Sequence, residues 1–177
     1  MTSFDFNSFI IDIPNYPQEG VTFKDITPLI ADSQGFSAII DEIANHFKDA
    51  GITKVLGAEA RGFMIGAPVA YALNAGFVPA RKPGKLPRKT IKKEYALEYG
   101  TDALEIHEDA LGPSDVVLIV DDLVATGGTV TAQIDLINQC GARLAGMGFL
   151  MELAFLDPRN LISKSTEAEI YSLVIVQ

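Results

Sequence analysis

One segment constrains the fold of this chain more than any other. The apolar run Val116–Val120 leads directly into two carboxylates, a glycine-bearing loop and an amphipathic helical pattern. An unbroken run of β-branched and aliphatic residues predicts a strand buried on both faces, as in a parallel sheet covered by helices. Because ligands of open parallel sheets bind beyond the carboxyl ends of the strands, the segment predicts an α/β fold with a binding site where this strand ends.

The loop after this strand has the composition of a phosphate site. Its residues are Ala125, Thr126, Gly127, Gly128 and Thr129. They offer backbone N–H groups and threonine hydroxyls, and the N-terminus of the following helix adds partial positive charge. Asp121 and Asp122 stand directly before the loop and would repel a phosphate, so sugar hydroxyls or a hydrated Mg²⁺ fit them best. No lysine follows the glycines as in the GxxxxGK[ST] loop, and the pattern is not GxGxxG.

Composition and charge narrow the class of protein. The chain has 177 residues, which fits one domain over 1–177, and its mean hydropathy of +0.22 fits a buried parallel sheet. A net charge of −9 argues against a nucleic-acid or anionic membrane surface. No apolar run approaches the ~18 residues of a membrane span, and the first residues lack the basic region of a secretory signal. Cys140 is the only cysteine, so we expect no intrachain disulfide and a cytoplasmic location.

The basic residues are unevenly distributed. Half of the 14 lysines and arginines lie within residues 81–93, a segment without acidic residues. They are Arg81, Lys82, Lys85, Arg88, Lys89, Lys92 and Lys93. In an acidic protein such a concentration predicts a small anionic ligand, and the alternative is a solvated loop.

Strand and helix patterns alternate along the chain. Strands are expected at 54–58, 77–80, 116–120, 143–150 and 171–176, and helices at 33–50, 63–73 and 129–140. Strands that alternate with helices of this length imply parallel βαβ units. Two weakly alternating pieces, 95–99 and 103–107, predict a hairpin or a mobile flap.

The motif ValAspAspLeuValAlaThrGlyGlyThr at 120–129 resembles the diphosphate-sugar signature of the type I phosphoribosyltransferases, and its form is most similar to the adenine-specific branch. In that family the two acids hold the ribose 2′ and 3′ hydroxyls of phosphoribosyl pyrophosphate (PRPP), and the loop binds its 5′-phosphate. The resemblance implies the type I phosphoribosyltransferase fold. This is a twisted, mainly parallel five-stranded sheet with flanking helices, a small hood made by about residues 1–30, and a mobile flap.

Two further segments resemble the parts of this family that bind pyrophosphate. The segment Gly57–Phe63 is similar to the pyrophosphate loop, which often contains a cis peptide. There the Arg61 guanidinium would bind the pyrophosphate through two hydrogen bonds, and Glu59 would orient that guanidinium. Residues 81–87 are similar to the family's basic loop beside the pyrophosphate, and the members that match by position are Arg81, Lys82 and Lys85.

The remaining motifs resemble the parts that hold the base. Residues 94–100 are similar to the active-site flap, in which Glu98 would exchange a proton with a purine ring nitrogen and Tyr99 would close over the reacting centre. Residues 16–29 are similar to the hood, in which Phe23 would stack on the base. Thr22 and Lys24 would flank it with main-chain groups, although members of the family usually carry Arg where Lys24 stands.

The resemblance implies a function in purine salvage. The expected reaction transfers the phosphoribosyl group of PRPP to adenine and gives AMP and pyrophosphate, with Mg²⁺ held mainly by PRPP, near Asp121 and Asp122. The family usually forms homodimers, and no nucleic acid or membrane is expected as a partner. The alternatives are a phosphoribosyltransferase for another base (xanthine, hypoxanthine or orotate), a non-catalytic regulator that binds PRPP, and a diphosphate-sugar synthase.

Overall fold

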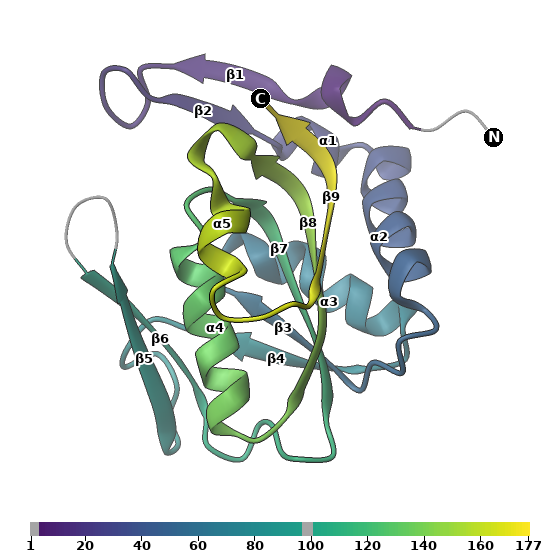
Figure 1. Cartoon of the computed structure of the whole chain (residues 1–177). Coiled ribbons are helices and arrows are strands. Elements are labelled where there is room, and N and C mark those ends of the chain that lie inside the picture. Colours follow the sequence, from purple (N-terminus) through teal and green to yellow (C-terminus); the bar gives the residue numbers. More distant parts are fainter. Residues whose placement is uncertain (1–3, 97–100) are drawn as a thin grey trace.

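The centre of the molecule is a parallel sheet. A computed structural model describes residues 4–96 and 101–177. In its main sheet the strands run in the order β4-β3-β7-β8-β9, and every neighbouring pair is parallel (Figure 1). The strands are β3 (Lys54–Ala58), β4 (Gly76–Ala80), β7 (Val116–Val124), β8 (Arg143–Leu153) and β9 (Glu169–Val176). The predicted five-stranded parallel sheet is confirmed.

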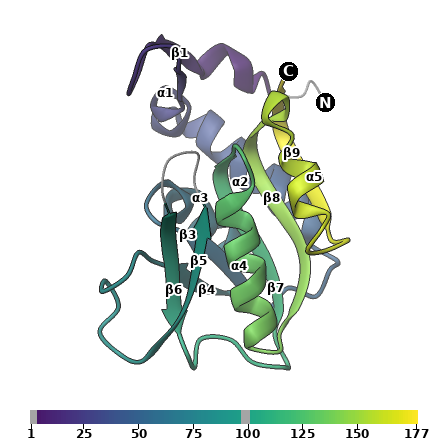
Figure 2. The same ribbon diagram turned by 60° about the vertical axis from the view of Figure 1, so that its left-hand side comes forward.

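Helices cover both faces of this sheet (Figures 1 and 2). They are α2 (Ser33–Phe47) and α3 (Arg61–Ala72) on one face and α4 (Gly128–Gln139) on the other. Strand β7 serves both cores because its side chains alternate between them: Val117 and Ile119 pack with α4, whereas Leu118 and Val120 pack with α2 and α3. The described residues contain no helix that is both long and apolar enough to cross a membrane.

The ends of several predicted elements were wrong: α3 begins at Arg61 rather than 63, β8 ends at Leu153 rather than 150, and β9 begins at Glu169 rather than 171. Helix α2 is capped by the Asp32 carboxylate, which accepts the Gly35 N–H at 2.7 Å, but it ends at Phe47 rather than near residue 50. Strand β7 continues to Val124, since Asp121, Leu123 and Val124 are all in register with β8. The two acids therefore belong to the strand itself and do not follow it.

Several short elements were not predicted at all. They are η1 (Phe6–Phe9), β1 (Ile11–Pro14), β2 (Thr22–Asp25), α1 (Thr27–Ala31), η2 (Ala154–Leu156) and α5 (Pro158–Ile162). Strands β1 and β2 form an antiparallel hairpin that lies above the carboxyl ends of β8 and β9 (Figure 1). This hairpin is in the region that the resemblance assigns to the hood.

The flap region is a second hairpin. Strands β5 (Thr90–Ala96) and β6 (Thr101–His107) pair antiparallel and lie beside α4 (Figure 2). The predicted hairpin is present, but β5 begins earlier than expected, so Lys92 and Lys93 lie on a strand. Glu98 and Tyr99 fall between the two strands and lie outside the described residues.

Candidate active site

The site lies at the point where the order of the strands in the sheet reverses direction. After β3 the chain builds β4 on one side, and it later adds β7 on the other side of β3. In open α/β sheets, ligands bind at such a switch point, beyond the carboxyl ends of the strands. Here a cavity of about 320 Å³ opens between the ends of β3 and β7. It is lined by residues 58–61, Lys82, Tyr95, Leu104 and residues 121–130.

The loop between β7 and α4 forms one wall of the cavity. Gly127 has a φ of +89°, which favours glycine, and its backbone is closely covered. A Cβ there would lie 3.2 Å from Ile162 Cγ1 and 3.3 Å from the Pro158 carbonyl oxygen. Helix α4 begins at the next residue, so its first N–H groups, which have no partner within the helix, belong to this wall. The exposed Thr126 and the half-buried Thr129 add hydroxyls.

The two acids at the end of β7 are both buried but differ chemically. Asp122 Oδ2 lies 2.9 Å from Arg61 Nε, so Asp122 has a cationic partner. Asp121 Oδ1 instead accepts the Asp122 N–H at 2.9 Å and lies against Gly62, where a Cβ would come within 2.6 Å of it. Burial, and next the charge of Asp122, raise the pKa of Asp121 well above its usual range. The two carboxyls therefore differ in their partners: Asp122 pairs with a cation, whereas Asp121 is held by a backbone N–H.

Arg61 links these acids to the hood. Besides pairing with Asp122, its guanidinium carbon lies 5.2 Å from the centroid of the Phe23 ring. The expectation that Glu59 orients Arg61 was wrong, because both Glu59 oxygens are engaged by the segment after β4. The peptide bond between Glu59 and Ala60 is cis.

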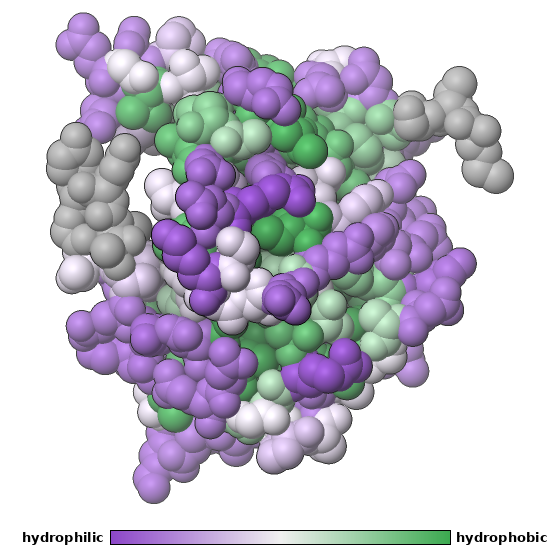
Figure 3. Space-filling view, viewed as in Figure 1, coloured by the Kyte–Doolittle hydropathy of each residue, from purple (hydrophilic) through white to green (hydrophobic). Residues whose placement is uncertain are grey.

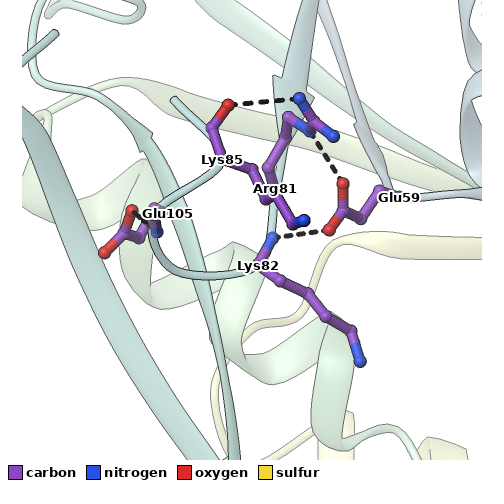
Figure 4. Close-up of polar contacts among 6 residues, drawn as sticks. Glu59, Arg81, Lys82, Lys85 and Glu105 are labelled. Atoms are coloured by element: carbon purple, nitrogen blue, oxygen red, sulfur yellow. Dashed lines mark hydrogen bonds and ion pairs between the residues drawn. The ribbon is translucent and has the colours of Figure 1, made fainter. Parts of the chain in front are cut away.

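Figure 4 shows how Glu59 holds the basic segment. Its Oε2 accepts Arg81 Nε–H at 2.7 Å, and its Oε1 accepts the Lys82 N–H at 3.0 Å. Arg81 also donates to the Lys85 carbonyl at 3.2 Å. Burial acts to raise the pKa of Glu59, but the hydrogen bonds from Arg81 and Lys82 outweigh it and lower that pKa. Lys82 lines the cavity, whereas Arg81 and Lys85 are not among its lining residues.

Two residues of the β5–β6 hairpin belong to the site and were missed. Asp102 pairs with Lys82 at 3.1 Å and raises the pKa of that lysine. The half-buried Tyr95 lines the cavity, and its hydroxyl lies beside Thr129 and Asp102. Tyr95 lies in the segment 94–100 compared with the flap but was given no role there, and no motif signalled Asp102. The antiparallel pairing of the hairpin places Tyr95 opposite Asp102, and only a correct register could have shown that they meet.

The hood residues lie next to the cavity and not in its wall. Thr22, Phe23 and Lys24 are not among the residues that line it, and Phe23 reaches it through Arg61. The Lys24 ammonium is occupied by Asp12, 2.7 Å away on the neighbouring strand. The side chain of Lys24 is therefore directed to the hood itself.

Comparisons with known proteins agree with this geometry. The profile of the phosphoribosyl transferase domain matches residues 28–158. A relative from Sodalis glossinidius, named adenine phosphoribosyltransferase, is 51% identical over 166 residues, which cover 94% of this chain and 90% of the relative. The chain belongs to the adenine phosphoribosyltransferases.

Solved structures of adenine phosphoribosyltransferases share the whole fold. The crystal structure of the protein from Thermoanaerobacter pseudethanolicus superposes with a TM-score of 0.92 at 45% identity, covering 97% of this chain and 98% of that one. The protein from Saccharomyces cerevisiae was crystallised with adenine and an imino-altritol bisphosphate. It gives a TM-score of 0.88 at 38% identity, with 95% and 96% coverage. The type I phosphoribosyltransferase fold is thus confirmed.

Proposed function

We propose that the cavity between β3 and β7 is where the adenine phosphoribosyltransferase reaction takes place, in which PRPP and adenine give AMP and pyrophosphate. The observation that carries this proposal is the meeting of three separate segments at one cavity: the loop after β7, Arg61 at the start of α3, and Lys82 after β4. Each offers groups suited to a different part of PRPP.

The residues Ala125, Thr126, Gly127, Gly128 and Thr129 would hold the 5′-phosphate. Backbone N–H groups at the start of α4 and the partial positive charge of that helix end favour a dianion. Asp121 and Asp122 would bind the ribose hydroxyls. Carboxyl oxygens accept hydrogen bonds from hydroxyl groups, and both acids line the cavity.

The pyrophosphate would be bound by cations of two segments. Arg61 and Lys82 line the cavity and would contact it directly. Arg81 is tied to Glu59 and donates to the Lys85 carbonyl, which supports a role of Arg81 and Lys85 in shaping the loop and in providing positive potential. These charges would stabilise the pyrophosphate as it departs from the anomeric carbon.

The base would lie between the hood and the hairpin. Phe23 would stack on adenine while main-chain groups of Thr22 and Lys24 bind its edge. Glu98 would hold or deliver the proton of a purine ring nitrogen, and Tyr99 would cover the reacting centre. The position of Tyr95 supports this assignment, because the strand that leads to Glu98 contributes to the cavity wall.

The residues present fit a magnesium-bound substrate. Carboxylates are the ligands that Mg²⁺ prefers, and Asp121 and Asp122 bring two of them to the cavity. Within 4–96 and 101–177, no group of three or more potential metal ligands is arranged around one point. We propose that Mg²⁺ is held mainly by PRPP near these two acids, where it would neutralise charge on the pyrophosphate.

The direct test is to supply the protein with PRPP, Mg²⁺ and one purine at a time. AMP should form from adenine, and comparable kcat/KM with hypoxanthine, xanthine or guanine would overturn the assignment of the base. Glu98→Gln should lower kcat far more than it weakens AMP binding. Glu94→Gln is the matched control, since Glu94 lies on the same hairpin and pairs only with the nearby Lys92 among described residues.

A homodimer and a cytoplasmic location are part of the proposal. Several large apolar side chains are between 37% and 61% exposed, among them Ile11, Ile13, Phe155 and Ile175. Figure 3 shows apolar surface in the upper part of the face in view. Exposed apolar side chains of this size support an interface between subunits. Light scattering on the purified protein tests it: a monomeric mass would contradict the dimer. The single cysteine supports a reducing compartment.

A further inference from the structure

We infer that Glu152, Arg159 and Ser172 form a brace that fixes the shape of the phosphate loop, which makes them positioning residues for PRPP. None of them is among the residues that line the cavity. The inference rests on the proposed role of the loop Ala125–Thr129 as the site of the 5′-phosphate. It concerns how that loop is held in place.

The brace is an ion pair built on a buried carboxylate, and the side chain of its cation, Arg159, is 49% exposed. Arg159 Nε and Nη2 each donate at 2.7 Å, to Glu152 Oε1 and Oε2 respectively, and the Ser172 hydroxyl donates to Oε2 at 2.7 Å. Glu152 is only 2% exposed. Hydrogen bonds from Arg159 lower the pKa of Glu152 against the opposing effect of burial. A buried carboxylate needs such partners, because an unpaired charge there is strongly destabilising.

The brace connects two parts of the phosphate loop's support. Glu152 lies near the end of β8, in register with Val124, which is the last residue of β7 before the loop. Arg159 lies on α5, which contacts α4 (Figure 1). On that helix, Ile162 and the Pro158 carbonyl lie against Gly127, the residue of positive φ in the loop. The ion pair thus joins the strand beside the loop's start to the helix that covers its middle.

This placement predicts an effect on PRPP and not on adenine. Without the bidentate pair, α5 loses its polar attachment to β8, so the cover over Gly127 loosens and the N–H groups of the loop lose their common direction. Binding of a phosphate by backbone groups depends on that preorganisation. The KM for PRPP should rise, while the KM for adenine, which the hood and the flap determine, stays unchanged.

The test compares Glu152→Gln and Arg159→Lys with a control of similar cost in stability. Ile39→Val removes a methylene from a fully buried side chain of α2, on the opposite face of the sheet. Glu152→Gln should raise the KM for PRPP about tenfold, roughly the effect of losing one charged hydrogen bond. Arg159→Lys, which keeps the charge but not the bidentate geometry, should give a smaller rise. Ile39→Val should lower Tm without changing either KM.

Other outcomes separate the inference from the proposed function. If Glu152→Gln lowers Tm but leaves the KM for PRPP unchanged, the pair is structural only and the inference is wrong. Thr129→Val tests the loop itself: if it too leaves PRPP binding intact, the assignment of the loop fails first. Should Glu152→Gln not fold, Ser172→Ala keeps the ion pair and removes one hydrogen bond. A KM for PRPP that does not rise in this variant, at normal Tm, would also contradict the brace.

Discussion

Two segments of this molecule would bind the phosphates of the proposed substrate, and they are built in opposite ways. The loop after β7 contains no cationic side chain and would rely on backbone N–H groups, held in place by the buried Gly127 and by α5 packed against it. The segment after β4 would rely on charged side chains: Lys82, which lines the cavity, is paired with Asp102, and Arg81 behind it is tied to Glu59. The first would present a fixed surface, and the second would present the Lys82 charge, whose partner Asp102 can be exchanged for the substrate.

This difference matches the fates of the two phosphates in the reaction. The 5′-phosphate is present in both PRPP and AMP, so a rigid site can hold it without rearrangement. The pyrophosphate must be bound and then released as a separate product. Cations that return to protein carboxylates when the pyrophosphate leaves lower the cost of that release, because they are not left unpaired. Rigid recognition suits the group that stays, and exchangeable charges suit the group that departs.

The largest effect is expected from Gly127→Ala. The new Cβ would meet Ile162 and the Pro158 carbonyl in a backbone conformation that alanine adopts at a cost of about 1–2 kcal/mol. The KM for PRPP should rise by on the order of 100-fold, and Tm should fall. Steady-state kinetics with PRPP varied, together with thermal unfolding, measure both.

Gly84→Ala is the matched control in the basic segment. Gly84 has a φ of +77°, but nothing lies within 4 Å of the position of its Cβ. The Gly84→Ala substitution should lower the free energy of unfolding by about 1 kcal/mol through backbone strain alone, and it should change the KM for PRPP little. Equal kinetic effects at the two glycines would refute the distinction between a rigid and an adjustable site.

Asp122→Asn should have the next largest effect. The substitution keeps the shape of the side chain but removes the charge that pairs with Arg61 2.9 Å away. Losing charge-assisted hydrogen bonds of about 1.5–3 kcal/mol to the ribose should lower kcat/KM for PRPP by ~10–100-fold. Adenine binding by itself, measured by calorimetry, should remain. An unchanged kcat/KM would show that the acids at the end of β7 do not contact the sugar.

The sequence predicted the sheet and the rigid part of the site better than the adjustable part. The run Val116–Val120 and the loop after it are local signals, so strand, loop and helix could be read in order. The partner of Glu59 could not be predicted in this way. Arg61 is only two residues away and was the obvious candidate, whereas Arg81 is distant in sequence and comes close only because β3 pairs in parallel with β4. Helix α5 was missed because five residues carry too little periodicity.

Arg81→Gln should have a moderate effect that depends on salt. The change breaks the contact with Glu59 and removes positive charge beside the cavity without touching its wall. The KM for PRPP should rise by roughly threefold to tenfold at low ionic strength, and less at high ionic strength, where screening already weakens the attraction. Arg88→Gln, at an exposed pair further out, should be nearly neutral. A salt-independent effect at Arg81 would favour a direct contact with PRPP.

The smallest effect concerns pH and separates the two segments by a different measurement. The pKa of Glu59 is lowered in the folded protein, since hydrogen bonds from Arg81 and Lys82 outweigh burial, whereas its ordinary value is 4.5. A carboxylate with a depressed pKa contributes stability that is complete above its unfolded pKa and is lost as the pH falls through the folded one. Below about pH 4.5, Glu59→Gln should therefore lose less stability per pH unit than the unmodified protein. At neutral pH the same variant should be the less stable of the two, because it lacks the charge that pairs with Arg81. Urea unfolding at several pH values tests this, and parallel pH curves for the two proteins would mean that Glu59 does not hold the basic segment through its charge.

The loop after β7 has no titrating side chain, so Gly127→Ala should lower the free energy of unfolding by the same amount at every pH, without changing its slope with pH.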